Sequence, residues 1–163
     1  MTTVFVSVGS NIEREKNIRR GVDALRVSYG ELSLSSVYQS QAVGFEGDDF
    51  YNLVLSFESD QPVTAVASTL REIETRYGRI RSSTKFSSRT LDLDILLFGQ
   101  EDYRAQGLDI PRAEIGKYAH VLQPLAELVP EQRHPICGQR YQQLWAEFKV
   151  PEHTLWVVPF DWS

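Results

Sequence analysis

The segment 92–98 constrains the fold of this chain more than any other part of the sequence. It reads Asp-Leu-Asp-Ile-Leu-Leu-Phe, so acidic and aliphatic residues alternate at its start. Because successive side chains of a strand point to opposite faces, Asp92 and Asp94 are expected to share one face and Leu93 and Ile95 the other. The chain is therefore expected to form a sheet that keeps two carboxylates together on one face at this strand.

The remaining pattern predicts the order of the elements. Apolar residues recur at helical spacing in two segments, and four segments show the short pattern of strands. Their order, β-α-β-β-α-β, predicts two helices packed on one face of an antiparallel sheet. In the second strand, the alternation places Leu34 and Tyr38 on the same side. We expect strands at 3–8, 32–38, 50–57 and 92–98, helices at 12–27, 62–78, 125–128 and 141–148, and a last strand at 153–158.

Residues 1–163 are expected to form a single domain, because the sequence contains no linker, repeat or low-complexity stretch. The net charge of −5 argues against a protein that coats nucleic acid. No apolar run approaches the roughly 18 residues that a membrane helix needs. The single cysteine, Cys137, cannot form an intrachain disulfide, and no Cys/His spacing resembles a zinc site. A cytoplasmic protein without a membrane or nucleic-acid partner is expected.

Asp92 and Asp94 are candidate metal ligands. Two carboxylates held side by side repel each other, and a divalent cation removes that cost. Hard oxygen ligands suit Mg²⁺, which typically takes one or two carboxylates together with phosphate oxygens. Taken alone, however, the pair is more simply explained as two solvated aspartates on an exposed strand face.

A group of basic residues precedes the aspartates. Arg79, Arg81, Lys85 and Arg89 lie in the segment 78–91, which contains no acidic residue. A metal site next to guanidinium groups is what phosphoryl transfer requires. A solvated basic loop is the simpler alternative. It is disfavoured because the basic residues lie directly next to the two carboxylates. Because this long segment shows neither helical nor strand period, we predict a loop that closes over phosphates.

The segment 89–99, Arg-Thr-Leu-Asp-Leu-Asp-Ile-Leu-Leu-Phe-Gly, is similar to the signature of the 6-hydroxymethyl-7,8-dihydropterin pyrophosphokinase family. The resemblance runs over nearly the whole chain, including the segments 8–11, 36–38, 50–52, 74–81 and 122–130. It implies an α+β, ferredoxin-like fold and an enzyme of folate biosynthesis that transfers the β,γ-diphosphate of ATP to the hydroxymethyl oxygen of the pterin. ATP, a pterin and two Mg²⁺ ions are the ligands it implies, and we expect a monomer.

The resemblance also implies roles for individual residues. Asp92 and Asp94 would hold both metal ions, and Phe50 and His120 would stack on the two sides of the pterin ring. The catalytic residues so implied are Arg79, Arg89, Asp92 and Asp94. The ATP-binding residues are Glu74, Arg79, Arg81, Arg89, Arg112 and Tyr118. The pterin-binding residues are Val43, Gly44, Phe50, Asn52, Phe86, Asp92 and His120.

Several positions depart from the family pattern. They leave open an enzyme for a related pterin, or a pterin- or nucleotide-binding protein without turnover. Intact metal and arginine positions argue against the last alternative. The usual family residues at these places are Gly-Pro (here Ser87 and Ser88), Trp (Phe86), His-Tyr (Arg112 and Ala113), Arg (Tyr118) and Phe (His120).

Overall fold

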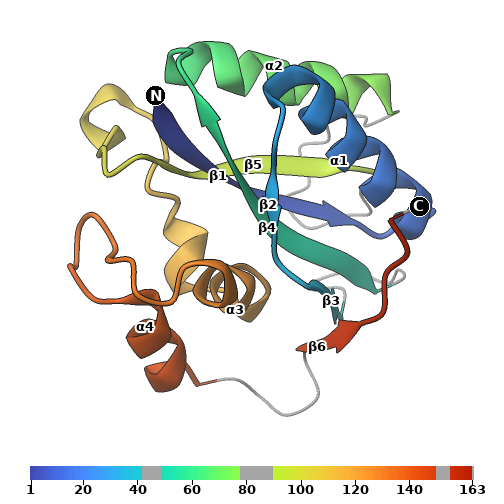
Figure 1. Ribbon diagram of the computed structural model, residues 1–163. Coiled ribbons are helices and arrows are strands. Elements are labelled where there is room, and N and C mark those ends of the chain that lie inside the picture. The colour runs from blue at the N-terminus through green and yellow to red at the C-terminus, as the bar shows by residue number, and fades with distance from the viewer. Residues whose placement is uncertain (42–48, 78–89, 150–154, 163) are drawn as a thin grey trace.

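The computed structural model describes residues 1–41, 49–77, 90–149 and 155–162. Its strands are β1 (Thr2–Ser10), β2 (Ser33–Leu34), β3 (Val37–Ser40), β4 (Phe50–Ser59), β5 (Asp92–Phe98) and β6 (Leu155–Val158). They form an antiparallel sheet in the order β5-β1-β4-β3-β6, and β2 pairs with β4 beside this path (Figure 1). The order β5-β1-β4-β3 is that of the ferredoxin-like fold, as predicted.

Two helices cover one face of the sheet, as the β-α-β-β-α-β pattern predicts. They are α1 (Arg14–Tyr29) and α2 (Val63–Arg76), which lie side by side in Figure 1. Ile18, Val22 and Leu25 form the buried stripe of α1 and are fully enclosed. Leu93 and Ile95 of β5 belong to the same core, so the predicted apolar face of this strand is confirmed.

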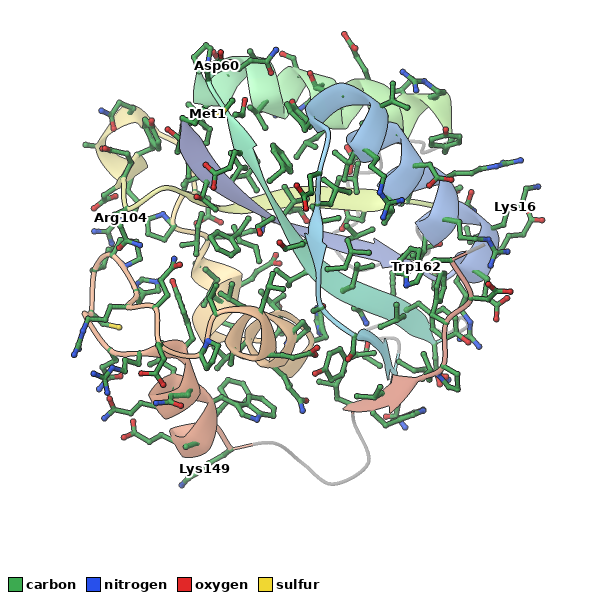
Figure 2. The ribbon with its side chains drawn as sticks, in the orientation of Figure 1. Met1, Lys16, Asp60, Arg104, Lys149 and Trp162 are labelled. Carbon is green, nitrogen blue, oxygen red and sulfur yellow. The ribbon has the colours of Figure 1, made fainter. Side chains whose placement is uncertain are left out.

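A second helical layer covers the opposite face, so the sheet lies between two layers of side chains (Figure 2). Phe5 and Val54 of the sheet pack there with Leu122, Leu125 and Tyr141. This layer follows β5 in the chain. It comprises the 3₁₀ turn η2 (Ala113–Gly116) and the helices α3 (Ala119–Leu128) and α4 (Tyr141–Glu147), whereas the 3₁₀ turn η1 (Arg104–Gln106) lies between Tyr103 and Leu108, which pack against the first core.

Helix α3 is longer than the sequence predicts. We expected a short helix at 125–128, whereas the structure begins the helix at Ala119 and places Pro124 inside it. A proline within a helix removes one backbone hydrogen bond and is normally unfavourable. Burial of Val121, Leu122 and Leu125 against the sheet offsets that cost.

The strand predicted over 32–38 is interrupted at Ser35 and Ser36. The hydroxyl of Ser35 accepts the hydrogen bond of the Val54 backbone N–H at 2.9 Å, in the place of a strand carbonyl. The backbone N–H of Ser36 turns away from the sheet and donates to Glu127 of α3 at 2.9 Å. Side-chain hydrogen bonds therefore replace part of the ladder and divide the segment into β2 and β3.

The interruption changes which side chains share a face. The alternation predicts Leu34 and Tyr38 on one side, and this prediction was wrong. Leu34 packs against the core under α1 and α2, whereas the hydroxyl of Tyr38 reaches Glu127 in the opposite layer.

None of the helices in the described part of the chain is long and apolar enough to cross a lipid bilayer.

Candidate active site

Asp92 and Asp94 lie on the face of the sheet that α3 covers, opposite the core under α1 and α2. In the pairing of β5 with β1, Asp92 is opposite Gly9 and Asp94 is opposite Ser7. Gly9 is in turn opposite Asn52 of β4. Cross-strand partners point to the same face of a sheet. Asp92, Gly9 and Asn52 therefore form a row across three strands, with the backbone of Gly9 exposed between a carboxylate and an amide.

Two contacts at the end of β1 and on α2 fix the start of β5. The buried hydroxyl of Ser10 donates to the carbonyl of Thr90 at 2.6 Å. The carboxylate of Glu74, which is only 2% exposed, accepts the hydrogen bond of the Leu93 backbone N–H at 2.8 Å. These contacts hold the strand on both sides of Asp92. A direct contact of Glu74 with nucleotide stays a prediction.

Arg112 lies beside Asp94. Its Nη2 is 3.6 Å from Asp94 Oδ1 and donates a hydrogen bond to Glu114 Oε1 at 3.2 Å. All three side chains are about a quarter exposed, with relative exposures of 25%, 25% and 26% for Arg112, Asp94 and Glu114. Partly buried charges are screened less than surface charges, so this group dominates the local electrostatics.

Burial, followed by the negative charge of Asp92, raises the pKa of Asp94 to about 7, although Arg112 opposes the shift. Glu114 and Glu74 add to the negative field. The pKa of the Arg112 guanidinium is raised: burial lowers it, but the carboxylates of Asp94 and Glu114 more than compensate. The site is thus a place where added positive charge stabilises the ionised form of Asp94.

The donor set fits Mg²⁺ bound together with phosphate. Asp92 and Asp94 offer hard oxygen atoms from one face of the strand, and the negative charge of Asp92 contributes to the raised pKa of Asp94. Among the described residues, no group of three or more His, Cys, Asp or Glu side chains is arranged to hold a metal ion. The remaining ligands would therefore be phosphate oxygens and water.

The opposite end of the row is built around Asn52. Its Nδ2 donates to the hydroxyl of Ser40 at 2.7 Å, and both residues are buried. A methyl group in place of the Gly9 hydrogen would lie 3.4 Å from Asn52 Oδ1 and 3.8 Å from Phe50 Cδ1. Phe50 and Asn52 therefore lie close to the backbone of Gly9, which is opposite Asp92 on the other side.

The start of α3 brings His120 and Tyr118 toward the same face. Their rings stack on each other, with centroids 5.2 Å apart and an interplanar angle of 15°. Burial lowers the pKa of His120, while the charges of Glu114 and Asp92 oppose the shift. Burial thus disfavours the protonated form of His120, which lies near enough to Glu114 and Asp92 to feel their charges. Its predicted stacking on a pterin opposite Phe50 stays a prediction.

Glu127 ties α3 to the edge of the sheet. Its carboxylate accepts hydrogen bonds from the backbone N–H and the hydroxyl of Ser36, both at 2.9 Å, and from the hydroxyl of Tyr38 at 2.6 Å. Tyr38 is opposite Asn52 in the pairing of β3 with β4. These hydrogen bonds therefore fix α3, which carries His120, relative to β3 and to the neighbouring strand β4, which carries Asn52.

Several predicted site residues lie outside the described part of the chain. Of those described, Phe50, Asn52, Asp92, Asp94, Arg112 and His120 are gathered on the α3 side of the sheet, Tyr118 stacks on His120, and Glu74 lies buried on α2. Those outside it are Val43, Gly44, Arg79, Arg81, Phe86 and Arg89.

Four residues of this face were not identified from the sequence: Gly9, Ser40, Glu114 and Glu127. Glu127 contacts Ser36 and Tyr38, which are far from it in the chain, so no local pattern marks it, and Glu114 matters through Arg112, whose position beside Asp94 only the fold reveals. Gly9 follows a β-branched strand and precedes Ser10, and we interpreted it only as part of a turn. Strand register, which places it between Asp92 and Asn52, is what reveals its position.

Comparison with known proteins supports the resemblance. The sequence profile of the 7,8-dihydro-6-hydroxymethylpterin-pyrophosphokinase (HPPK) family matches residues 5–130. A 2-amino-4-hydroxy-6-hydroxymethyldihydropteridine pyrophosphokinase of Aquifex aeolicus is 32% identical over 157 residues, which cover 95% of this chain and 94% of the relative. The protein of the same name from Pseudomonas aeruginosa is 36% identical over 141 residues, 81% of this chain and 83% of the relative.

Solved structures show the same fold. A Plasmodium falciparum HPPK-DHPS chain matches with a TM-score of 0.72 over 90% of this chain, at 12% sequence identity. The present chain spans 45% of that longer chain. At this identity the similarity concerns the arrangement of helices and strands alone.

Proposed function

The chain belongs to the 7,8-dihydro-6-hydroxymethylpterin-pyrophosphokinase family, and we infer that it transfers pyrophosphate from ATP to the hydroxymethyl group of 6-hydroxymethyl-7,8-dihydropterin. The products are AMP and the pterin diphosphate. The proposed location of the reaction rests on one observation, the row Asp92–Gly9–Asn52 across three strands. It sets the carboxylate of Asp92 beside the backbone of Gly9, with the amide of Asn52 on the other side, and this supports the proposed neighbourhood of metal and pterin.

Asn52 and Phe50 would bind the pterin. Asn52 keeps Oδ1 and one Nδ2 hydrogen beyond its contact with Ser40, so it can still accept and donate a hydrogen bond to the edge of a heterocycle. The ring of Phe50 offers its face to a flat aromatic ligand. Held there, the hydroxymethyl arm of the pterin would point along the row toward Asp92.

Asp92 and Asp94 would hold Mg²⁺, and we propose two ions. When bound, the metal neutralises the phosphate oxygens and orients the nucleotide. In the transfer, the hydroxymethyl oxygen forms a bond to the β-phosphorus of ATP, and the bond from that phosphorus to the oxygen bridging the α-phosphorus breaks. AMP leaves with that oxygen and the bonding electrons, and the hydroxyl proton is released. Arg79, Arg81 and Arg89 are proposed to contact the phosphates.

Several further properties are proposals. Residues 1–163 would act as one domain and as a monomer, in the cytoplasm. Glu74, Arg112 and Tyr118 would lie on the nucleotide side, and Val43, Gly44, Phe86 and His120 on the pterin side. The contact between Arg112 and Asp94 supports this division, because Asp94 lies on β5, which β1 separates from the strand that carries Asn52.

A coupled assay of AMP release tests the proposal. With 6-hydroxymethyl-7,8-dihydropterin, ATP and Mg²⁺, the wild-type chain should release AMP only when all three are present. Asp92→Asn and Asp94→Asn should each lower kcat by at least about a hundredfold, since one electrostatic stabiliser of the transition state is typically worth that much. Asp102→Asn, at an exposed carboxylate paired with Arg104, is the control and should behave as wild type. Pterin-independent AMP release would exclude the proposed function, and near-normal activity of Asp94→Asn would exclude the proposed metal-binding role of Asp94.

A further inference from the structure

Arg112 contacts two carboxylates through a single nitrogen atom. Nη2 donates a hydrogen bond to Glu114 at 3.2 Å and lies at a longer ion-pair distance of 3.6 Å from Asp94. A guanidinium that holds a carboxylate firmly uses two parallel N–H groups. Arg112 makes no such bidentate contact with either carboxylate in the structure described, so its hold on Asp94 is the weaker of two single contacts.

The rest of the Arg112 side chain is also incompletely bonded. Its Nε is buried and has no hydrogen-bond partner among the described residues. An unpaired buried donor is unfavourable, and structures retain one where another requirement outweighs it. Here that requirement is neutralisation of Asp94, whose partly buried carboxylate lies 3.6 Å from the Arg112 guanidinium.

The backbone on either side of Arg112 is fixed. The Arg112 N–H donates to the carbonyl of Leu96 in β5 at 2.9 Å, and the Ala113 N–H donates to Asp109 at 3.0 Å. The carbonyl of Glu114 accepts from the N–H groups of Lys117 and Tyr118, both at 3.0 Å. The Arg112 guanidinium is therefore the part that can move. It can rotate while it stays bonded to Glu114, and the backbone need not change.

We propose that Arg112 is an exchangeable counter-ion of the metal site. It neutralises Asp94 while the site holds no metal, and it is held by Glu114 alone once a divalent cation takes its place on Asp94. This inference rests on the proposed metal-binding role of Asp92 and Asp94. Glu114 acts as the receiving carboxylate, which keeps the displaced charge paired and next to the nucleotide side of the site.

The exchange has a chemical consequence for ATP. A guanidinium carries five N–H donors, and departure from Asp94 releases those that pointed toward the metal ligands. Together with the unpaired Nε, they can bind an anionic oxygen. The cation that arrives with the nucleotide would thus free the Arg112 guanidinium to bind the nucleotide. Arg112 would pair first with Asp94 and then with phosphate.

Mn²⁺ binding in the absence of nucleotide tests the exchange, with free Mn²⁺ measured by electron paramagnetic resonance at pH 8. Arg112→Ala should tighten binding about fivefold, because a competing, partly screened unit charge is removed. Arg112→Gln, which keeps most of the stem, should act in the same direction. Glu114→Gln should weaken binding, since it leaves Arg112 with Asp94 as its sole partner. Arg104→Ala, which removes an exposed arginine paired with Asp102, is the matched control and should change nothing.

The double variant Arg112→Ala/Glu114→Gln separates exchange from simple attraction. If Glu114 acts through Arg112, the loss caused by Glu114→Gln should be at least halved in the Arg112→Ala background. An equal loss in both backgrounds, or unchanged binding in both Arg112 variants, overturns the inference. Asp94→Asn distinguishes this failure from that of the metal site. If it leaves Mn²⁺ binding unchanged, or if no variant binds Mn²⁺, then the metal site is wrong, and the exchange with it.

Discussion

The side-chain amide of Asn52 donates a hydrogen bond to Ser40 Oγ at 2.7 Å, within the buried face that carries the row of Asp92 and Gly9. The hydroxyl of Ser40 thereby fixes which way the amide points, because Oδ1 and Nδ2 are otherwise nearly equivalent in shape. Ser40 lies diagonally across β3 and β4 from Asn52 and needs no contact with substrate to have this effect.

Ser40→Ala should raise the KM for the pterin by about fivefold and change kcat and the KM for ATP little. Loss of one hydrogen bond to a buried amide is worth roughly 1 kcal/mol. Ser40→Thr keeps the hydroxyl and should recover most of the affinity. Steady-state kinetics with each substrate varied in turn is the measurement. Equal changes in both KM values would mean that Ser40 supports the fold in general and not the orientation of Asn52.

Gly9→Ala should separate stability from activity. The added methyl group meets Asn52 and Phe50 at ordinary van der Waals distances, and alanine loses less backbone entropy on folding than glycine. The variant should therefore melt at a temperature equal to or higher than that of wild type. The methyl group would occupy the space against which the pterin ring is proposed to lie, so pterin binding measured by calorimetry should weaken by at least tenfold. Unchanged pterin affinity would place the ring elsewhere.

Asp94→Asn should stabilise the metal-free protein at high pH. The folded pKa of Asp94 is raised from 3.8 to about 7 by burial and by Asp92. A raised pKa contributes stability that is fully present below the unfolded value and is lost as pH rises through about 7. In the presence of a chelator, the excess in melting temperature of Asp94→Asn over wild type should be small at pH 5, just above the unfolded pKa, and should grow as the pH rises toward 7. The variant should melt several degrees higher at pH 8.5, at roughly 2–4 °C per kcal/mol.

Asp102→Asn is the control for this comparison, because the pKa of Asp102 is lowered whereas that of Asp94 is raised. Hydrogen bonds from Arg104 lower the pKa of Asp102 to about 2, so its charge contributes stability above the unfolded value. The substitution should give no gain at pH 8.5. If Asp94→Asn does not raise the melting temperature at pH 8.5 either, burial and the charge of Asp92 do not destabilise the ionised form of Asp94.

Glu127→Ala should cost about 2–4 kcal/mol in the free energy of unfolding. The change leaves the Ser36 N–H and the hydroxyls of Ser36 and Tyr38 without their acceptor, and each unmet group that is shielded from water costs roughly 1–3 kcal/mol. Tyr38→Phe removes only one of these donors and should cost about 1 kcal/mol. Urea unfolding of both variants measures the difference. Equal, small losses would show that α3 is held by its apolar contacts alone.

The alternation Asp-Leu-Asp-Ile was sufficient to predict the two faces of β5, and the apolar spacing predicted the helices over Ile18 and Leu70. Both signals are local, because a side chain and its neighbours two to four residues away decide them. They also predicted the ferredoxin-like strand order, since short connections leave few alternatives.

The parts that sequence reasoning missed depend on residues far apart in the chain. The break at Ser36 is caused by a hydrogen bond to Glu127, and the length of α3 by burial of its apolar face despite Pro124. The pairing of Arg112 with Asp94 and Glu114 likewise required the turn after β5 to return to that strand. Propensity and periodicity carry no information about such contacts.

The hydrogen bond from the Leu93 N–H to Glu74 also bears on solubility. In the described part of the chain, β5 pairs only with β1, so its other side is an edge of the sheet. Free N–H groups along an edge recruit strands from other molecules and lead to aggregation. The buried carboxylate of Glu74 takes up the donor between Asp92 and Asp94. A second copy of the chain therefore finds no free template there, whereas an ion or small molecule can still approach the carboxylates from the face of the sheet.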